Sequence, residues 1–433
     1  MKKNVVIYDC VSNTTKLLGA ELDVPHEDEH RMCTSSRLQT LYVGANGRDS
    51  RPITLSKKTL RLVPSLRVVN LSEGIQVDGA VLLTDTLRKY ANVERLDLSS
   101  NNVGVLGTEA LRKEFPYLSK LRYLDLSSNR LDPLALAQAL SHAPKLQGLD
   151  LSRNDLGHGG GMVFLETSLV FMQTLRHLNL SSNGICAEGA MQILRSAHRM
   201  ETLDLSCNDV GPVGAAALAS ALDGMPGLRS LDLSHNGIGA EGAEVLSATL
   251  RDMRHLESLR LAGNAVGDSG AAALASAFEC MSSLRSVVLS ANAIGDDGGV
   301  RIARALIRST DLRLLDLGGN RLGCAAAEAT ATALEWLEEI QHLDLSNNLI
   351  GVRGAHALSR GLECTPDLRY LFLSFNDLRS EGVAAIFRAI GPSRNTLRQV
   401  DLSFNNSQDD EDAARMISSV DYNLCCYTME CDE

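Results

Sequence analysis

Residues 228–255 read LRSLDLSHNGIGAEGAEVLSATLRDMRH, and the following 28 residues repeat the same pattern. The first part has the form Leu-x-x-Leu-x-Leu-x-x-Asn, which runs from Leu228 to Asn236. This pattern occurs fourteen times along the 433 residues, and the six steps from Asn208 to Asn376 are each 28 residues long. A fixed period of this size predicts a stack of short structural repeats around one continuous core.

The last position of the pattern marks each repeat. It is Asn in every repeat except the second, where Gly74 replaces it. In chain order the position is filled by Asn46, Gly74, Asn101, Asn129, Asn154, Asn183, Asn208, Asn236, Asn264, Asn292, Asn320, Asn348, Asn376 and Asn405.

Each repeat begins with a predicted short strand. Side chains alternate between the two faces of a strand, so Leu231 and Leu233 point into the core and Asp232 points to the opposite, concave surface. Asn236 then turns the chain, because its side chain can pair with backbone groups that a tight bend leaves open. The pattern predicts one inward leucine ladder and one outward polar row.

The second part of each repeat is a predicted helix. Ala243, Leu246 and Leu250 follow one another at spacings of three and four, which places them on one helical face. We expect Gly242 to allow close approach of this helix to the sheet, since a side chain there would hold the two apart. Strand and helix then bury their apolar faces only by stacking on neighbouring repeats.

The fold class predicted is α/β: a right-handed solenoid, or horseshoe, of about 14 repeats. The parallel sheet lines the concave face and the helices cover the convex face. Residues 37–420 form the predicted solenoid, with a terminal helix near 413–420. Residues 1–36 form an N-terminal cap, in which NVVIYDC is a strand over the first open edge, and residues 421–433 form a C-terminal cap or tail.

The segments NGIGAEGAEVLSATL, NAIGDDGGVRIARAL and NDLRSEGVAAIFRAI resemble the ribonuclease-inhibitor-like subclass of leucine-rich repeat proteins. That subclass includes inhibitors, immune receptors, actin regulators, axonemal subunits and GTPase activators. The resemblance therefore implies a non-enzymatic scaffold that binds a protein partner through its concave face, in a cytoskeletal or axonemal assembly among other settings. The alternative is a Ran-type GTPase activator, although Asp409–Asp412 is shorter than the acidic tail of that group.

The net charge and the apolar runs of the sequence limit the kinds of partner that we expect. A net charge of −11 disfavours nucleic acid and favours a partner with a basic surface. No apolar run approaches the 18 residues of a membrane span, and MKKNVVIYDC has too short an apolar run for a secretory signal. We therefore expect a cytoplasmic protein that binds no membrane, metal or cofactor, whose ten cysteines are reduced and mostly fill small apolar spaces.

An acidic row is predicted along the concave face, at the residue between the second and third leucines of each repeat. It is either the usual polar filler of such strands or a stripe that attracts a basic partner, for which Asp97, Asp125 and Asp150 are the candidate residues. The row reads Tyr42, Asn70, Asp97, Asp125, Asp150, Asn179, Asp204, Asp232, Arg260, Val288, Asp316, Asp344, Phe372 and Asp401.

Arg260 and Val288 interrupt this row at two successive repeats. The interruption is either neutral variation or a less acidic part of the row that is open to a partner. Both residues are therefore candidates for partner binding.

Aromatic residues gather near the C-terminal end, although the chain has only 17 of them. Tyr370 and Phe372 are expected to project from the concave face. Phe375 and Phe404 precede their turn asparagines, where they are either exposed or buried under the next loop. The group is therefore either a partner site, since exposed aromatics dominate interfaces, or a cap on the last repeats.

Catalysis is not expected. The concave positions hold two histidines, His177 and His342, which lie six repeats apart. An open, wet aspartate row is not expected to raise a carboxyl pKa as acid–base chemistry requires.

Overall fold

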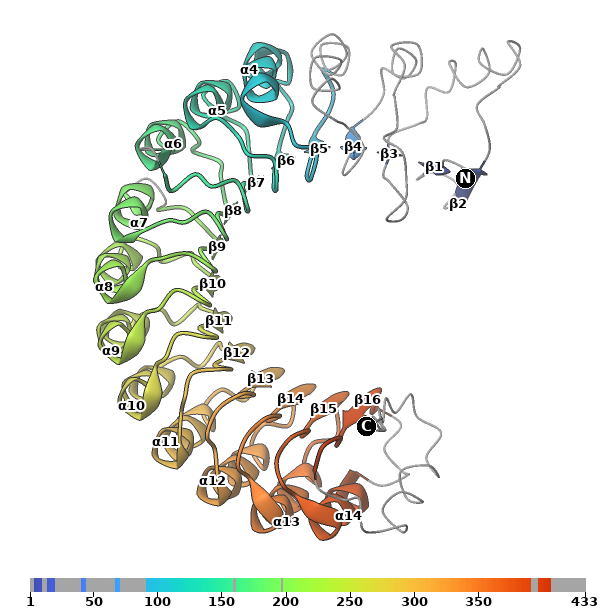
Figure 1. Cartoon of the computed structure of the whole chain (residues 1–433), viewed down its shortest axis with the longest axis vertical. Coiled ribbons are helices and arrows are strands. Elements are labelled where there is room, and N and C mark those ends of the chain that lie inside the picture. The colour runs from blue at the N-terminus through green and yellow to red at the C-terminus, as the bar shows by residue number, and fades with distance from the viewer. Residues whose placement is uncertain are drawn as a thin grey trace, which may run out of the picture. The chain divides into compact units, whose positions relative to one another are not determined.

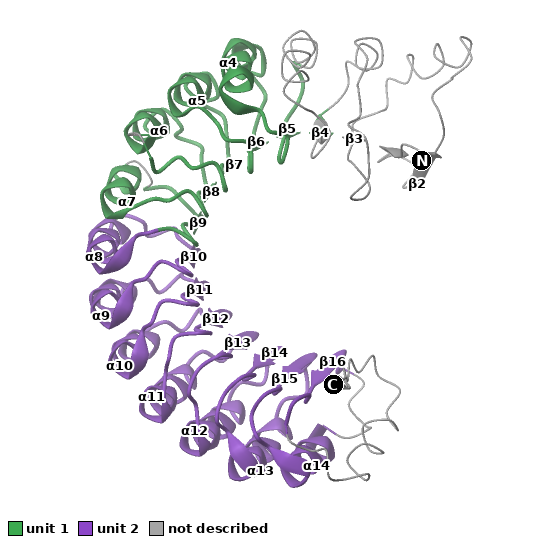
Figure 2. Ribbon diagram, in the orientation of Figure 1, with its two compact units in different colours: residues 1–208 green, residues 209–433 purple. Residues whose placement is uncertain are grey.

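The computed structural model describes residues 4–9, 14–19, 40–43, 67–70, 91–158, 161–195, 198–390 and 396–405. The chain forms two compact units, residues 1–208 and 209–433 (Figure 2). Within each unit, short strands lie side by side along the inner face and helices lie along the outer face (Figure 1). The sequence predicted one solenoid over this span, so the division after Asn208 is an addition to that prediction.

The first unit alternates strands and helices. Its strands β3 to β9 are parallel and in register, one per repeat. The strands are β3 (Thr40–Val43), β4 (Val68–Asn70), β5 (Arg95–Asp97), β6 (Tyr123–Asp125), β7 (Gly148–Asp150), β8 (His177–Asn179) and β9 (Thr202–Asp204). The described helices are α4 (Gly104–Glu114), the 3-10 helix η1 (Phe115–Tyr117), α5 (Pro133–Leu140), α6 (Gly161–Leu169) and α7 (Ala187–Leu194).

The second unit continues the same alternation with parallel strands in register. Its strands are β10 (Ser230–Asp232), β11 (Ser258–Arg260), β12 (Ser286–Val288), β13 (Leu314–Asp316), β14 (His342–Asp344), β15 (Tyr370–Phe372) and β16 (Gln399–Asp401). Its helices are α8 (Gly211–Leu222), α9 (Gly239–Leu250), α10 (Gly267–Phe278), α11 (Asp296–Leu306), α12 (Cys324–Leu334), α13 (Gly351–Leu362) and α14 (Arg379–Ile390).

The leucines of the repeat form the core, as predicted. Leu231 of β10, Leu233 directly after this strand and Leu246 of α9 are all 0% exposed. Burying one such side chain contributes about 1.5 to 3 kcal/mol, so these positions dominate the stability of each repeat. The α/β repeat architecture expected from the period is confirmed.

The asparagines tie successive repeats together. The amide of Asn264 donates from Nδ2 to the carbonyl oxygens of Leu233 (2.9 Å) and Leu261 (3.0 Å). Its Oδ1 accepts the backbone N–H groups of Asn236 (3.0 Å) and Ile238 (3.3 Å). Asn264 is 0% exposed, so one buried amide closes the turn of its own repeat and satisfies the backbone of the preceding one.

Gly242 lets α9 pack closely, as the sequence suggested. A Cβ atom at this position would lie 2.6 Å from Cγ2 of Ile238 and 3.0 Å from Cβ of Ala215. Both distances are too short for carbon atoms in contact, so any side chain would push α9 away from its own turn and from the preceding helix, α8.

Helix α11 is capped from the preceding helix. Oδ1 of Asp268, in the first turn of α10, accepts the backbone N–H groups of Gly295 (2.8 Å) and Gly298 (2.9 Å) at the start of α11. Asp296 makes the same two bonds to Gly323 and Ala326 at the start of α12. Unpaired N–H groups at a helix start need an acceptor, and here the neighbouring repeat supplies it.

The N-terminal strand predicted at NVVIYDC is present as β1 (Asn4–Asp9). It pairs antiparallel with β3 and with β2 (Thr14–Gly19), a strand that the sequence pattern did not predict. The predicted helix at 413–420, the tail at 421–433 and the acidic run at 409–412 lie outside the described residues. The domain boundaries therefore stay predictions.

Candidate functional site

The predicted outward row lies in register along the strands of each unit. In the first unit Asp97, Asp125 and Asp150 are successive partners across β5, β6 and β7. In the second unit Asp344 is the partner of Phe372, and Phe372 is the partner of Asp401. The parallel register thus aligns these side chains on the inner face of each unit, one strand spacing apart.

One carboxylate oxygen of each aspartate closes the end of its own strand. Oδ1 of Asp150 accepts the backbone N–H of Ser152 at 2.9 Å and its hydroxyl at 2.7 Å. Asn179 accepts the N–H of Ser181 in the same way at 3.0 Å, and its Nδ2 donates to Oδ2 of Asp150 at 2.8 Å. An amide can therefore replace the carboxylate at this position without losing the strand-end bond.

The pKa of Asp125 and of Asp316 is raised. For Asp125 the main cause is burial, which the bonds from Ser127 partly offset and which the charges of Asp150 and Asp97 reinforce. For Asp316 burial again dominates, and Asp344 adds to it. Neighbouring side chains therefore remove much of the water from these two carboxyls, so the row is less open to solvent than the sequence suggested.

The less acidic part of the row expected at Arg260 and Val288 is only partly open. Arg260 is exposed, and its Nε lies 3.6 Å from Oδ2 of Asp232, so it forms an ion pair along the row. Val288 is only 4% exposed. Its short side chain lies between the longer side chains of Arg260 and Asp316 on adjacent strands, which explains why it offers little surface to a partner.

His342 joins the aromatic residues of β15, a contact that the sequence pattern did not predict. Its ring centroid lies 5.7 Å from that of Tyr370 and 5.2 Å from that of Phe372. Burial lowers the pKa of His342, although the charges of Asp344 and Asp316 act in the opposite direction. The pattern that could have revealed this cluster is the 28-residue spacing from His342 to Tyr370.

Phe375 and Phe404 stack on each other in solvent. Their ring centroids are 4.2 Å apart, with an interplanar angle of 11°. The two side chains are 52% and 48% exposed, so burial under the next loop, one of the two sequence-based alternatives, is excluded.

Both phenylalanines also have a left-handed backbone, with φ of 55°. The residue before the turn asparagine has positive φ in every described repeat from Asn101 to Asn405. In order these residues are Ser100, Ser128, Arg153, Ser182, Cys207, His235, Gly263, Ala291, Gly319, Asn347, Phe375 and Phe404. Small or polar residues suit this conformation, whereas a bulky side chain there is unfavourable.

We define the aromatic face as His342, Tyr370, Phe372, Phe375 and Phe404. Tyr370 and Phe372 are the first and last residues of β15 and are half-buried, and the stacked pair lies just after the ends of β15 and β16. The four residues proposed from the sequence therefore lie on two neighbouring repeats of the second unit, with His342 as an unexpected fifth member.

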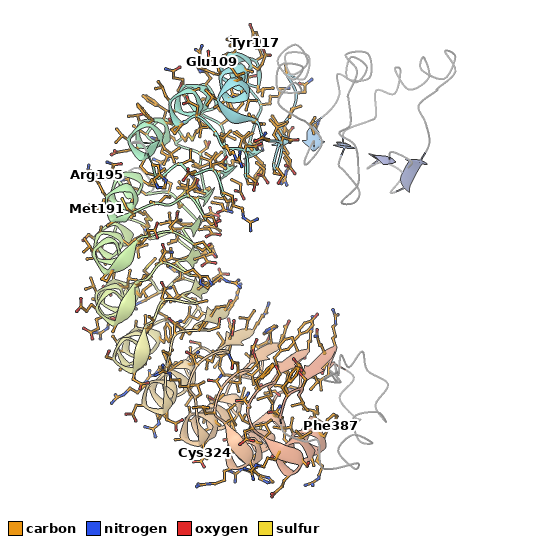
Figure 3. All side chains as sticks on the ribbon, viewed as in Figure 1. Glu109, Tyr117, Met191, Arg195, Cys324 and Phe387 are labelled. Carbon is orange, nitrogen blue, oxygen red and sulfur yellow. The ribbon has the colours of Figure 1, made fainter. Side chains whose placement is uncertain are left out.

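The outer face of the first unit carries apolar side chains that the sequence pattern did not single out. Leu106 of α4 is 69% exposed and Phe171, just after α6, is 61% exposed. Figure 3 shows Met191 and Arg195 on the outer side at α7. A hollow of about 160 Å³ lies near the ends of α6 and α7, between Met172 and Met200 among others.

The described cysteines are not core fillers, which corrects the expectation from composition. Cys186, Cys207, Cys280 and Cys364 are exposed, and Cys324 is partly exposed. They occupy turns and helix ends, where the repeat pattern leaves side chains in solvent.

Within the described part of the chain, no group of three or more His, Cys, Asp or Glu residues is arranged to hold a metal ion. Among the described helices, none has the length and apolar character needed to cross a membrane.

Two family models, both for the leucine-rich repeat, match the chain. One matches residues 91–156, and the other matches residues 171–194, 198–219, 226–247, 252–275, 280–303 and 366–387. The chain is a leucine-rich repeat protein. Leucine-rich repeat proteins generally act as scaffolds for protein interactions.

Relatives support the ribonuclease-inhibitor-like type of repeat. Ribonuclease inhibitor of Sus scrofa is 30% identical over 167 residues, which cover 36% of this chain and 35% of the inhibitor. The human NACHT, LRR and PYD domains-containing protein 12 is 34% identical over 148 residues, which cover 32% of this chain and 14% of that protein. The aligned segments thus span about a third or less of these relatives.

A solved structure supports the fold. The crystal structure of an internalin, inlF, of Listeria monocytogenes superimposes with a TM-score of 0.53 over 83% of this chain and 86% of the internalin. The sequence identity is 19%, so this likeness concerns the leucine-rich repeat fold alone.

Proposed function

We propose that this leucine-rich repeat protein is a non-enzymatic scaffold that holds a protein partner against the inner face of residues 209–433. The aromatic face is the contact surface in this proposal. The observation that carries it is the exposed stack of Phe375 and Phe404, because the fold tolerates two bulky side chains in an unfavourable conformation without burying either of them.

Exposed aromatic side chains favour a binding role over a capping role. A residue that caps the last repeats would be buried by the structure it seals, whereas Phe375 is 52% exposed. Aromatic residues dominate the binding energy of protein interfaces, where a partner covers them. A protein surface that covers this pair would gain the apolar burial that the isolated chain lacks.

The acidic row contributes long-range attraction in the same proposal. The negative charges of the first unit would attract a basic partner, and added salt would screen this attraction. The residues concerned are Asp97, Asp125 and Asp150. Arg260 is exposed and stays a candidate contact, while Val288 is too buried to be one of the main contacts. The cytoskeletal setting and the Ran-type alternative remain predictions from the resemblance.

The test begins by identifying the partner. Crosslinking mass spectrometry in the native cell gives the crosslinked protein, which is then purified for affinity measurements with the full chain. We expect Tyr370→Ala and Phe375→Ala each to weaken binding at least about tenfold, the effect of a residue that dominates an interface.

The matched control is Trp336→Ala. Trp336 is 58% exposed and follows α12, away from the strands of the aromatic face. Its replacement should leave affinity unchanged. If the Tyr370→Ala and Phe375→Ala variants bind the partner as tightly as the wild type does, the proposal is refuted. If these variants lose thermal stability but still bind the partner, the two residues belong to a cap. Stimulated GTP hydrolysis by Ran would favour the alternative.

A further inference from the structure

The aromatic face contains a ring that lies between two carboxylates. Phe372 is in register with Asp344 on one side and with Asp401 on the other. Neighbouring strands are about 4.8 Å apart, so a cation above the Phe372 ring would lie about 5 Å to the side of each aspartate. An aromatic face flanked by carboxylates attracts a cation both through the ring and through charge.

Asp344 and Asp401 each have one carboxylate oxygen that could contact a cation above the Phe372 ring. Oδ1 of Asp344 accepts the N–H of Ser346 at 2.8 Å, and Oδ1 of Asp401 accepts the N–H of Ser403 at 3.0 Å. Within the described residues, no hydrogen bond reaches Oδ2 of either aspartate. These two oxygens are therefore open to a donor from outside the chain.

The first unit contains an internal version of this contact. The guanidinium carbon of Arg95 lies 4.1 Å from the ring centroid of Tyr123, its register partner on the next strand. Tyr123 is the first residue of its strand, as Tyr370 is of β15. On the strands beside β15, however, the register partners of Tyr370 are His342 and Gln399, neither of which supplies a guanidinium.

Resting on the proposed function, we infer that the inner face of β14 to β16 binds an arginine side chain of a basic protein partner. The guanidinium stacks on Phe372 and donates to Oδ2 of Asp344 and Asp401. Arginine fits better than lysine because its planar group stacks on a ring while its five N–H donors reach carboxylates on both sides. The net charge of −11 favours a basic partner of this kind.

The neighbouring arginines of the chain do not occupy the position above the Phe372 ring. Arg260 is already paired with Asp232, and its strand β11 lies four strands away from that of Phe372. Arg369 and Arg398 precede β15 and β16 at the strand starts, about 10 Å along the chain from Phe372 and Asp401. Within the described residues, the cation–ring contact of Arg95 with Tyr123 has no counterpart at Phe372.

The test measures binding of a defined peptide to the full chain. The probe is a fluorescein-labelled peptide of repeated Arg-Gly-Ser units, compared by fluorescence anisotropy with matched peptides that carry citrulline or lysine instead of arginine. Citrulline keeps the planar shape of arginine but has no charge. We expect the arginine peptide to bind more tightly than either of the others.

Variants locate the site. Phe372→Leu, Asp344→Asn and Asp401→Asn should each weaken binding of the arginine peptide about three- to tenfold, as expected for loss of a cation–aromatic or ionic contact. The asparagine variants keep the strand-end bond, as Asn179 does, so they test the site even where Phe372→Leu unfolds. Asp204→Asn is the matched control, because it removes the same charge from the same strand position, on β9 of the first unit, and leaves the ion pair of Asp232 with Arg260 intact.

Three results would overturn the inference. They are equal binding of the citrulline or lysine peptide, an unchanged affinity of the three site variants, and an equal loss of affinity in Asp204→Asn, which would indicate diffuse attraction. The inference and the proposed function fail separately. If Phe372→Leu and Tyr370→Ala release the crosslinked partner but the peptides bind alike, the scaffold proposal stands and the arginine site does not.

Discussion

The rings of Phe375 and Phe404 stack in parallel at 4.2 Å, although both residues have a backbone conformation that disfavours bulky side chains. A left-handed backbone costs a residue other than glycine roughly 1 to 2 kcal/mol. Stacking of two aromatic rings returns about 0.5 to 1.5 kcal/mol. Two such residues together cost about 2 to 4 kcal/mol, which exceeds the gain from stacking, so the pair does not stabilise the repeats.

The first prediction follows from these opposing contributions at Phe375. In the preceding repeat the position equivalent to Phe375 is held by Asn347, which has the same left-handed backbone. Phe375→Asn therefore introduces a residue that this position already accepts. Because lost stacking and relieved strain oppose each other, we expect the free energy of unfolding to change by less than about 1 kcal/mol. Urea denaturation measures this change, and the affinity for the crosslinked partner should fall in the same variant.

The matched comparison is Leu345→Asn, which introduces the same residue at a core position that is 1% exposed. That change should unfold its repeat, since it buries an amide without partners. A loss of several kcal/mol on Phe375→Asn as well would show that the phenylalanine pair is structural and would remove the main support for a binding role.

The repeat was readable from the sequence because its chemistry is local and periodic. The alternation of Leu228, Leu231 and Leu233 fixes which face is buried, and the buried asparagines recur at the spacing that the turn requires. The outward row from Asp97 to Asp401 follows from the same alternation. Both therefore depend only on the order of residues within one repeat.

How far each side chain of the outward row is exposed to solvent could not be predicted from the repeat pattern. Val288 points to the inner face as predicted, yet it is 4% exposed because its neighbours on adjacent strands are longer. The stack of Phe375 on Phe404 likewise depends on residues one repeat apart. These features come from side chains of different repeats meeting in space, which the pattern within one repeat does not describe.

The second prediction concerns Asp268, which caps α11 from α10. Asp268→Ala leaves the N–H groups of Gly295 and Gly298 without this acceptor, so we expect a loss of about 1 kcal/mol in unfolding free energy. Urea denaturation of the full chain measures it. Asp297→Ala is the control, since Asp297 is exposed in the first turn of α11 itself. An equal loss in both variants would mean that first-turn charge, rather than the bonds between repeats, stabilises the helix.

The third prediction concerns the raised pKa of Asp125. Since burial disfavours the charged form, the stability linked to this group is present below its ordinary pKa of 3.8 and is lost as the pH rises through the raised value. Asp125→Asn keeps an acceptor for Ser127 and removes the charge. We expect its melting temperature at pH 7 to exceed that of the wild type by on the order of 1 °C, and the two to converge near pH 3.

Asp125→Ala separates the two effects. It removes the charge and also the bond to the backbone N–H of Ser127, which is 2.9 Å in the wild type. Its melting temperature should therefore lie below that of Asp125→Asn at pH 7. Melting of Asp125→Asn below the wild type at pH 7 would contradict a raised pKa at this position.

The last prediction concerns His342, whose shift has the opposite consequence. Burial lowers its pKa from the ordinary value of 6.5, so the neutral ring stabilises the fold above that pH and the stability is lost as the pH falls through the lowered value. Asp316 and Asp344 face the ring and oppose the shift, while Tyr370 and Phe372 pack against it. His342→Phe keeps an aromatic ring but cannot be protonated. We expect its melting temperature to fall less than that of the wild type between about pH 7 and pH 5, and NMR titration to place the His342 pKa below 6.5. A measured pKa above 6.5 would mean that the two carboxylates outweigh burial, and the acid sensitivity would then reverse.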